Sequence, residues 1–198
     1  HATDFPTQGH PFAMSPTGTQ VADGWIDTGD GFLVLDRNGN GQVDDVTEMF
    51  SEYFQEEPTT GLGALTTLDD HRDGRSDAQD STFTRLAIWQ DADSDALTDA
   101  GELQSLAHRN IDGIDLATTP LGTPVAGARI LAEGSFDYHD GHQGRFAELA
   151  LHVTTTAPTD TTSDAATMDA AMFDQKFMEL METHAATDGM TPANVNGM

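Results

Sequence analysis

The sequence predicts an α+β fold: a compact module with EF-hand-like calcium loops, short helices and a C-terminal β-hairpin, followed by a linker and an amphipathic helix. Three observations lead to this prediction. Acidic loops recur directly after short apolar segments, which is typical of metal-binding turns. Residues 129–138 and 145–153 alternate apolar and polar side chains around the turn sequence DGHQG, which predicts the hairpin. Apolar residues recur at helical spacing over 165–186, which predicts the helix.

The clearest acidic loop covers residues 91–102 and is called loop 3. Its oxygen-bearing side chains stand at positions 1, 3, 5, 9 and 12 of an EF-hand-type loop: Asp91, Asp93, Asp95, Asp99 and Glu102. Position 7, Leu97, offers its backbone carbonyl. Ca²⁺ takes six to eight oxygen ligands, and a coiled loop with a ligand at every second residue gathers them around one point. Ala96 occupies position 6, where the turn requires a positive φ, at a cost of about 1 kcal/mol relative to glycine.

Loop 1 covers residues 36–48 and carries fewer charges. Its expected ligands are Asp36, Asn38, Asn40, the carbonyl of Gln42, and Asp44, at positions 1, 3, 5, 7 and 9. Glu48 follows at position 13, one residue later than the usual glutamate. Because two carboxamides replace carboxylates, we expect loop 1 to bind calcium more weakly than loop 3.

Loop 2 covers residues 69–80. Its expected ligands, in order, are Asp69, His71, Asp73, the carbonyl of Arg75, Asp77 and Asp80. His71 is an awkward ligand because calcium prefers oxygen, and Asp80 is shorter than the usual glutamate. A capped surface turn is the alternative interpretation, so the sequence predicts two or three bound Ca²⁺ ions.

Composition agrees with a cation as partner. The chain has 198 residues, with 8 Lys and Arg against 34 Asp and Glu, and a formal net charge of −26. Nucleic acid and anionic membrane surfaces would be repelled by this charge. No cysteine is present, so disulfides and thiolate metal sites are excluded, and no apolar run is long enough to span a membrane. Solvation of the halophile type also explains an acidic surface.

The rest of the chain gives the domain organisation. Residues 1–23 form an extended lead-in, 24–153 the calcium-binding module, 154–164 a Thr-rich linker, and 165–198 the amphipathic helix and tail. Within the module we expect strands at 31–35 and 111–116, helical packing over 46–54 and after Glu102, and a loop over 117–128. The stripe over 165–186 either packs on its own domain or binds a protein partner or a second copy of the chain.

Histidines offer two further metal hypotheses. His1 and His10 have the composition of a copper-binding brace, and His139, His142 and His152 lie in or near the predicted hairpin. An exposed terminus and an exposed turn are the interpretations we favour for these two sets.

Three longer runs carry a family resemblance. GFLVLDRNGNGQVDDVTEMF, LDDHRDGRSDAQDSTF and LAIWQDADSDALTDAGEL occur in this order, followed by IDGIDL and the predicted hairpin. Over residues 24–153 this series resembles the calcium-binding and self-processing modules of Gram-negative bacterial RTX exoproteins, in order, in spacing and in the flanking Trp89.

The resemblance implies a secreted bacterial module, extracellular or at the cell surface, that folds on Ca²⁺ with the three loops as its sites. In self-processing members, calcium-driven folding leads to cleavage of an Asp-Pro bond at the start of the module, and the freed aspartate can be joined to a lysine amine. All eight prolines here follow other residues, so no Asp-Pro bond is present. We therefore expect calcium binding and assign no catalytic residue. A self-cleaving module and a calcium-stiffened assembly subunit are the alternatives.

Overall fold

A computed structural model describes residue 12 and residues 20–22, 26–55, 60–125, 128–155 and 166–174. Ten strands form one hydrogen-bonded sheet in which every pairing is antiparallel. The strands are β1 (Gln20–Ala22), β2 (Gly31–Leu35), β3 (Arg75–Asp77), β4 (Leu86–Trp89), β5 (Leu103–Ser105), β6 (Ile111–Asp115), β7 (Thr119–Val125), β8 (Ala128–Tyr138), β9 (Gln143–Thr155) and β10 (Ala166–Asp174).

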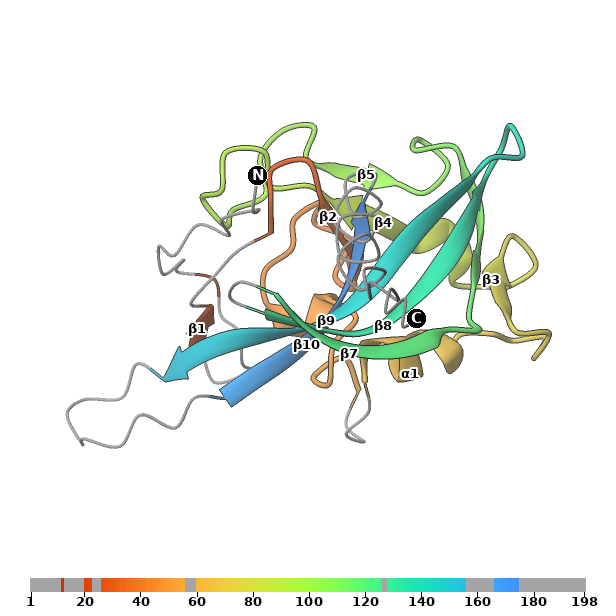
Figure 1. Ribbon diagram of the computed structural model, residues 1–198. Coiled ribbons are helices and arrows are strands. Elements are labelled where there is room, and N and C mark those ends of the chain that lie inside the picture. The colour runs from red at the N-terminus through yellow and green to blue at the C-terminus, as the bar shows by residue number, and fades with distance from the viewer. Residues whose placement is uncertain are drawn as a thin grey trace, which may run out of the picture.

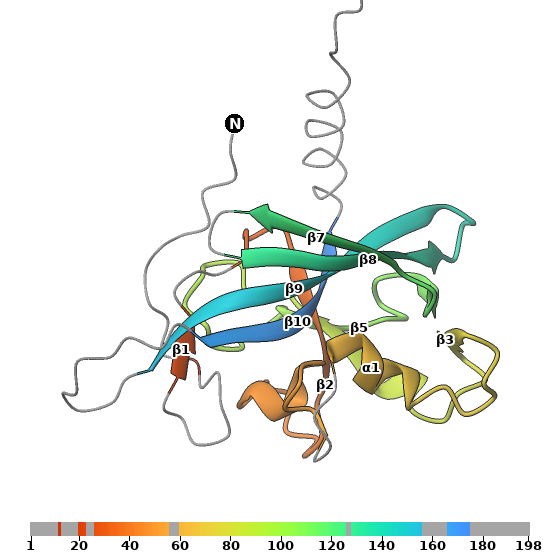
Figure 2. The same cartoon turned by 60° about the horizontal axis from the view of Figure 1, so that its bottom comes forward.

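The spatial order of the sheet is β3-β6-β8-β9-β10-β2-β4-β5, with β1 added to β9 and β7 added to β8. Figure 2 shows β7, β8, β9 and β10 side by side, and Figure 1 shows β10 passing between β9 and the β2–β4 pair. The last described segment of the chain therefore joins the long hairpin to the two central strands.

The predicted α+β fold class is wrong, because the structure is almost entirely β-sheet. Within the described residues the helices are α1 (Gly61–Thr66), of six residues, and two single 3₁₀ turns, η1 (Val46–Glu48) and η2 (Phe83–Arg85). Isolated short helices gain little stability in water, whereas neighbouring strands satisfy each other's backbone groups across the sheet. The predicted helical packing over 46–54 is thus limited to η1, and the helix expected after Glu102 is strand β5.

The predicted amphipathic helix over 165–186 is also wrong where the structure describes it. Residues 166–174 form β10, which pairs along β9 from Ala166 opposite Val153 to Asp174 opposite Arg145. The sequence ATMDAAMFD has methionines at 168 and 172 with alanine between them at 170, a spacing that fits a period of two as well as a helical turn. The open edge of β9 provides backbone partners and decides between the two. Residues 175–186 lie outside the described residues.

Other predictions are confirmed. The strand at 31–35 is β2, the strand at 111–116 is β6, and the hairpin is β8 and β9 joined by a turn at 139–142. The loop expected over 117–128 instead contains β7. Its two prolines, Pro120 and Pro124, suit an edge strand. Proline has no backbone N–H, so it could not donate a hydrogen bond to a strand on the other side of β7. Strand β9 continues to Thr155, the first part of the predicted linker, and residues 156–164 lie outside the described residues.

The central strands β2 and β4 are buried on both faces. Their side chains alternate between two hydrophobic clusters. Phe32, Val34, Ala87 and Trp89 enter one cluster, and Leu33, Leu35, Leu86 and Ile88 enter the other. All of these residues are at most 8% exposed. Loops 1 and 3 follow from these doubly covered strands, so their first residues are held in place by the core, whereas loop 2 follows α1.

Two reciprocal pairs of glycine and phenylalanine fix the β8–β9 hairpin. Gly134 lies opposite Phe146, and Phe136 lies opposite Gly144. A Cβ added to either glycine would overlap the ring of the phenylalanine across from it. Each ring therefore lies on the backbone of the neighbouring strand, which removes apolar surface from water and fixes the register.

We predict that Gly144→Ala and Gly134→Ala each destabilise the fold by roughly 1–3 kcal/mol, because the rings must leave their packed positions. Gly29→Ala is the matched control, since nothing lies within 4 Å of its added Cβ. Urea unfolding of the three variants measures the difference. Equal stabilities would contradict the role of these glycines.

Candidate metal centre

The three acidic loops have the same backbone conformation. In each of them the residues at positions 4 and 6 have positive φ angles: Gly39 and Gly41, Arg72 and Gly74, and Ser94 and Ala96, all between 56° and 84°. The positive φ expected at Ala96 is confirmed at 60°. Glycine adopts this conformation readily, but other L-residues rarely do, so Arg72, Ser94 and Ala96 require side-chain interactions that hold the backbone there.

The first aspartate of each loop supplies part of that hold. The carboxylates of Asp36, Asp69 and Asp91 accept the backbone N–H of position 6, at 2.8, 2.9 and 2.8 Å respectively. Each also accepts a second amide from position 4 or 5. The side chain at position 5 then accepts the amide of position 7 in all three loops. The chain is thereby wound around the first carboxylate.

The last acid of each loop closes the turn. Glu48, Asp80 and Glu102 each accept the amide of position 2 on one carboxylate oxygen and the amide of position 9 on the other, at 2.8–3.0 Å. These three side chains are buried, being 4–8% exposed. A carboxylate with two amide donors still has lone pairs for a cation, so this role does not conflict with metal binding.

Glu48 fulfils this role although it stands one residue late. The extra residue is absorbed in η1, whose N-cap Asp45 accepts the amide of Thr47 at 2.8 Å. The amide of Glu48 bonds the carbonyl of Asp45, as the amide of Glu102 bonds that of Asp99, so in loop 1 the same closing turn starts one residue later. The departure in spacing therefore does not remove Glu48 from the site.

Loop 3 brings its first three carboxylates together. Oxygens of Asp91, Asp93 and Asp95 all lie within 4.8 Å of one another. The pKa of Asp93 is raised, first by loss of hydration and then by the charges of Asp95, Asp91 and Glu102. Asp91 is 1% exposed, so this negative charge is only partly in contact with solvent. A group of this kind favours a cation, which would relieve the repulsion.

In loop 1 the expected ligands also converge. The side-chain amides of Asn38 and Asn40 both donate to Oδ2 of Asp44, at 2.7 and 2.8 Å. Positions 3, 5 and 9 of the loop therefore point to a common centre. Gln42, expected to offer its carbonyl, is exposed beside them.

In loop 2, His71 contacts the closing acid, with Nδ1 3.4 Å from Oδ1 of Asp80. Burial of Asp80 opposes its ionisation, but the amides of Asp77 and Asp70, together with His71, prevail and lower its pKa. Arg75 belongs to β3, and its guanidinium lies 2.6 Å from the carboxylate of Asp137 on β8. That ion pair fastens loop 2 to the hairpin.

Loops 1 and 3 meet at equivalent positions. The amide of Val43 donates to Oγ1 of Thr98 at 2.9 Å, and both residues stand at position 8 of their loops.

A pocket of about 390 Å³ lies at this junction of loops 1 and 3, and Leu97 and Phe12 are among the residues that line it. Phe12 is buried and its ring centroid is 5.3 Å from that of Trp89. The sequence analysis did not identify Thr98, because position 8 is not a ligand position. Aligning loops 1 and 3 position by position would have placed Val43 and Thr98 at the same point of the two loops.

The histidine hypotheses receive no common site. His139 lies 3.0 Å from Asp112 and His142 lies 3.0 Å from Asp140, and both rings are about four-fifths exposed. Within the part of the chain that the structure describes, the residues grouped closely enough to hold a metal are Asp91, Asp93 and Asp95. His1 and His10 lie outside the described residues, and His152 is placed only as part of β9.

Comparison with known proteins places these loops in a family. Residues 2–152 match the family model described as SPM domain. The iron-regulated protein FrpA of Neisseria meningitidis serogroup C, a bacterial protein, is 33% identical over 139 residues. That alignment covers 68% of this chain and 12% of FrpA, so the chain corresponds to a small part of that relative. Among the described residues, no helix has the length and apolar character needed to cross a membrane.

The closing acid should stabilise loop 3 in the calcium-saturated chain. We predict that Glu102→Ala costs roughly 1–3 kcal/mol more unfolding free energy than Asp99→Ala, because only Glu102→Ala takes the acceptor from the amides of Ala92 and Asp99. Asp99→Ala is the matched control, since it also removes one expected ligand of loop 3 and its side chain is exposed. Urea unfolding in saturating calcium measures both, and equal losses would show that Glu102 does not close the loop.

Proposed function

The chain belongs to the SPM domain family, and on that premise we propose that it is a calcium-binding module of a secreted bacterial protein whose folding is coupled to Ca²⁺ binding. The observation that carries the proposal is the threefold repetition of one loop geometry. Loops 1, 2 and 3 share the two positive-φ positions, the coiling around the first aspartate and the closure by the last acid.

The donor sets fit a hard cation. Loop 3 offers five carboxylates and the carbonyl of Leu97, all oxygen ligands. Loop 1 offers three carboxylates and two carboxamides, and loop 2 offers four carboxylates and one imidazole. We rank loop 3 as the tightest site and loops 1 and 2 as weaker, since affinity rises with the charge and oxygen content of the ligands.

Electrostatics couples binding to folding. In the folded chain the closing acids are buried and each loop gathers several carboxylates, in a molecule with a formal charge of −26. Divalent cations offset this repulsion in the folded state. A ligand that binds only the folded state stabilises it by RT ln(1 + [L]/Kd). Such a chain would remain loosely folded at cytosolic calcium levels and fold after export.

A calcium-triggered self-cleaving module is the second candidate, favoured by the resemblance to self-processing RTX modules. It requires a labile Asp-Pro bond, which the 198 residues do not contain. Mass spectrometry of the chain with and without Ca²⁺ separates the two candidates. A shortened or cross-linked product would favour cleavage, and an unchanged mass with calcium-induced folding would favour binding alone.

We predict that calcium orders the chain and that Asp93→Asn weakens the tightest site by at least about tenfold, because one carboxylate ligand becomes neutral. Asp112→Asn, which removes one exposed charge outside the loops, should leave that affinity unchanged. Calorimetric titration and circular dichroism provide the measurements. A chain that is equally folded in EDTA and takes up no calcium would refute the proposal.

Loops 1 and 3 should bind calcium cooperatively, because the Val43–Thr98 hydrogen bond links their centres. Thr98→Val removes the acceptor, and we predict that the coupling between the two sites falls by several-fold, in the range of one hydrogen bond. Thr47→Val is the control, since its hydroxyl donates to Asp45 within loop 1. Titrations that show the same cooperativity in both variants would exclude this coupling route.

A further inference from the structure

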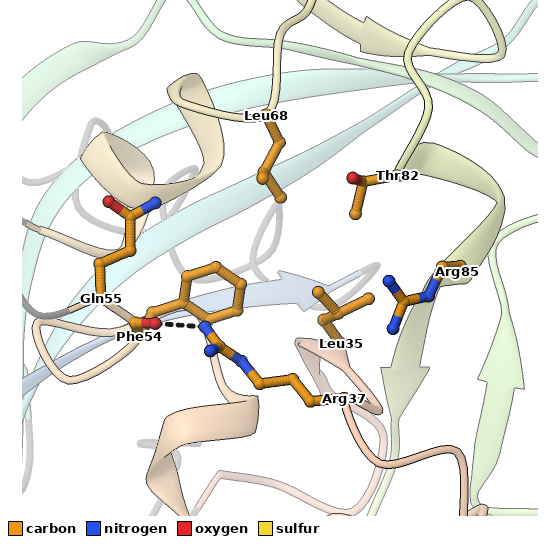
Figure 3. A pocket seen from close by; sticks show the side chains of 7 residues that line it. All are labelled: Leu35, Arg37, Phe54, Gln55, Leu68, Thr82 and Arg85. Carbon is orange, nitrogen blue, oxygen red and sulfur yellow. Dashed lines mark hydrogen bonds between the residues drawn. The ribbon is translucent and has the colours of Figure 1, made fainter.

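A second pocket lies where loop 1 begins and loop 2 ends, away from the ligand side chains of both. Its volume is about 540 Å³, within the range of small-ligand sites. Leu35 precedes loop 1, Leu68 precedes loop 2, and Arg85 follows loop 2 in η2. Figure 3 shows Leu35, Phe54 and Leu68 around one space, with the guanidinium of Arg85 on its other side and that of Arg37 beside Phe54.

The concentration of positive charge at this pocket is unusual for the chain. Only 8 of the 198 residues are Lys or Arg, and two of them line one pocket. Of the seven described arginines, Arg75 and Arg145 form ion pairs with carboxylates, and the other five, which include Arg37 and Arg85, form none. Arg37 and Arg85 are distinguished by lining the same pocket.

The guanidinium groups of Arg37 and Arg85 are held by neighbouring groups, but each uses few of its N–H donors. Arg37 donates to the carbonyl of Phe54 and its Cζ lies 4.1 Å from the centroid of the Phe54 ring. Arg85 has a long contact of 3.5 Å with the carbonyl of Asp36. Because a guanidinium carries five N–H donors, most of the donor capacity of both groups is free for another acceptor.

We propose that this pocket binds a carboxylate joined to an apolar side chain, as in the C-terminal residue of a peptide that ends in Leu, Met or Phe. The planar fork of arginine matches a carboxylate with two parallel hydrogen bonds. The partly exposed Leu68, together with the outer atoms of the buried Leu35 and Phe54, forms the apolar wall for the attached side chain, and Thr82 also lines the pocket. The net charge of −26 repels anions of high charge, so a monoanion is favoured over nucleic acid or polyphosphate.

This inference goes beyond calcium binding. Arg37 contributes to loop 1 through its backbone amide, which donates to Glu48. Its side chain lines the pocket instead. Arg85 lies outside the three loops. Loss of peptide binding and loss of calcium binding can therefore be separated by side-chain substitution.

The test uses the full chain in saturating calcium and an acetylated tripeptide ending in Leu-Phe with a free carboxylate. The same peptide with an amidated C-terminus and inorganic phosphate are the comparison probes. Calorimetry or NMR titration at millimolar peptide should give binding of the free acid, with at least about tenfold weaker binding of the amide, since the charge-assisted hydrogen bonds are lost.

Arg85→Gln should weaken binding of the free acid by about tenfold or more, while leaving calcium affinity and thermal unfolding unchanged. Arg129→Gln is the matched control, because it removes the same charge from an exposed position on β8. Leu68→Ser should also weaken binding, through loss of the apolar contact. Equal binding of acid and amide, stronger binding of phosphate, no binding of the acid, or equal effects of Arg85→Gln and Arg129→Gln would each overturn the proposal.

Discussion

The structure depends on carboxylates that accept backbone amides at both ends of each acidic loop. Asp91 winds the start of loop 3 around itself, and Glu102 joins positions 2 and 9. Loops 1 and 2 repeat this arrangement with Glu48 and Asp80. The side chains that would ligate a cation thus also accept backbone amides of largely exposed turns. The fold of each loop therefore concentrates negative charge.

The β-sheet gives these loops their relative positions. Strands β2 and β4 are covered on both faces and deliver Asp36 and Asp91 from a rigid core. The β8–β9 hairpin anchors loop 2 through the Arg75–Asp137 ion pair, and β10 joins the hairpin to β2. The two pockets lie at the places where loops meet, one between loops 1 and 3 and one between loops 1 and 2. The acidic surface is thus organised by a β framework, and that framework also places arginines where the loops adjoin.

Much of the candidate site was predictable because metal-loop chemistry is local. Ligand spacing, the positive φ at Ala96 and the strand that leads into Asp36 all follow from consecutive residues. The role of Glu48 was less certain from spacing alone, because the compensating 3₁₀ turn depends on the cap at Asp45. The helix over 165–186 was mispredicted for the opposite reason. The conformation of 166–174 is decided by β9, a partner more than ten residues away in the sequence.

By itself, the sequence determined the three acidic loops, the spacing of their oxygen-bearing side chains, the hairpin and the absence of thiols from these 198 residues. These features rest on residue type and on spacings within about a dozen positions, where local geometry dominates. Only the tertiary structure decided the fold class, the central place of β10, the contact between Val43 and Thr98, and the convergence of Arg37 and Arg85 on one pocket. Each of these joins segments distant in sequence. Strand pairing and side-chain convergence depend on which backbone edges and faces remain to be covered once the chain has folded.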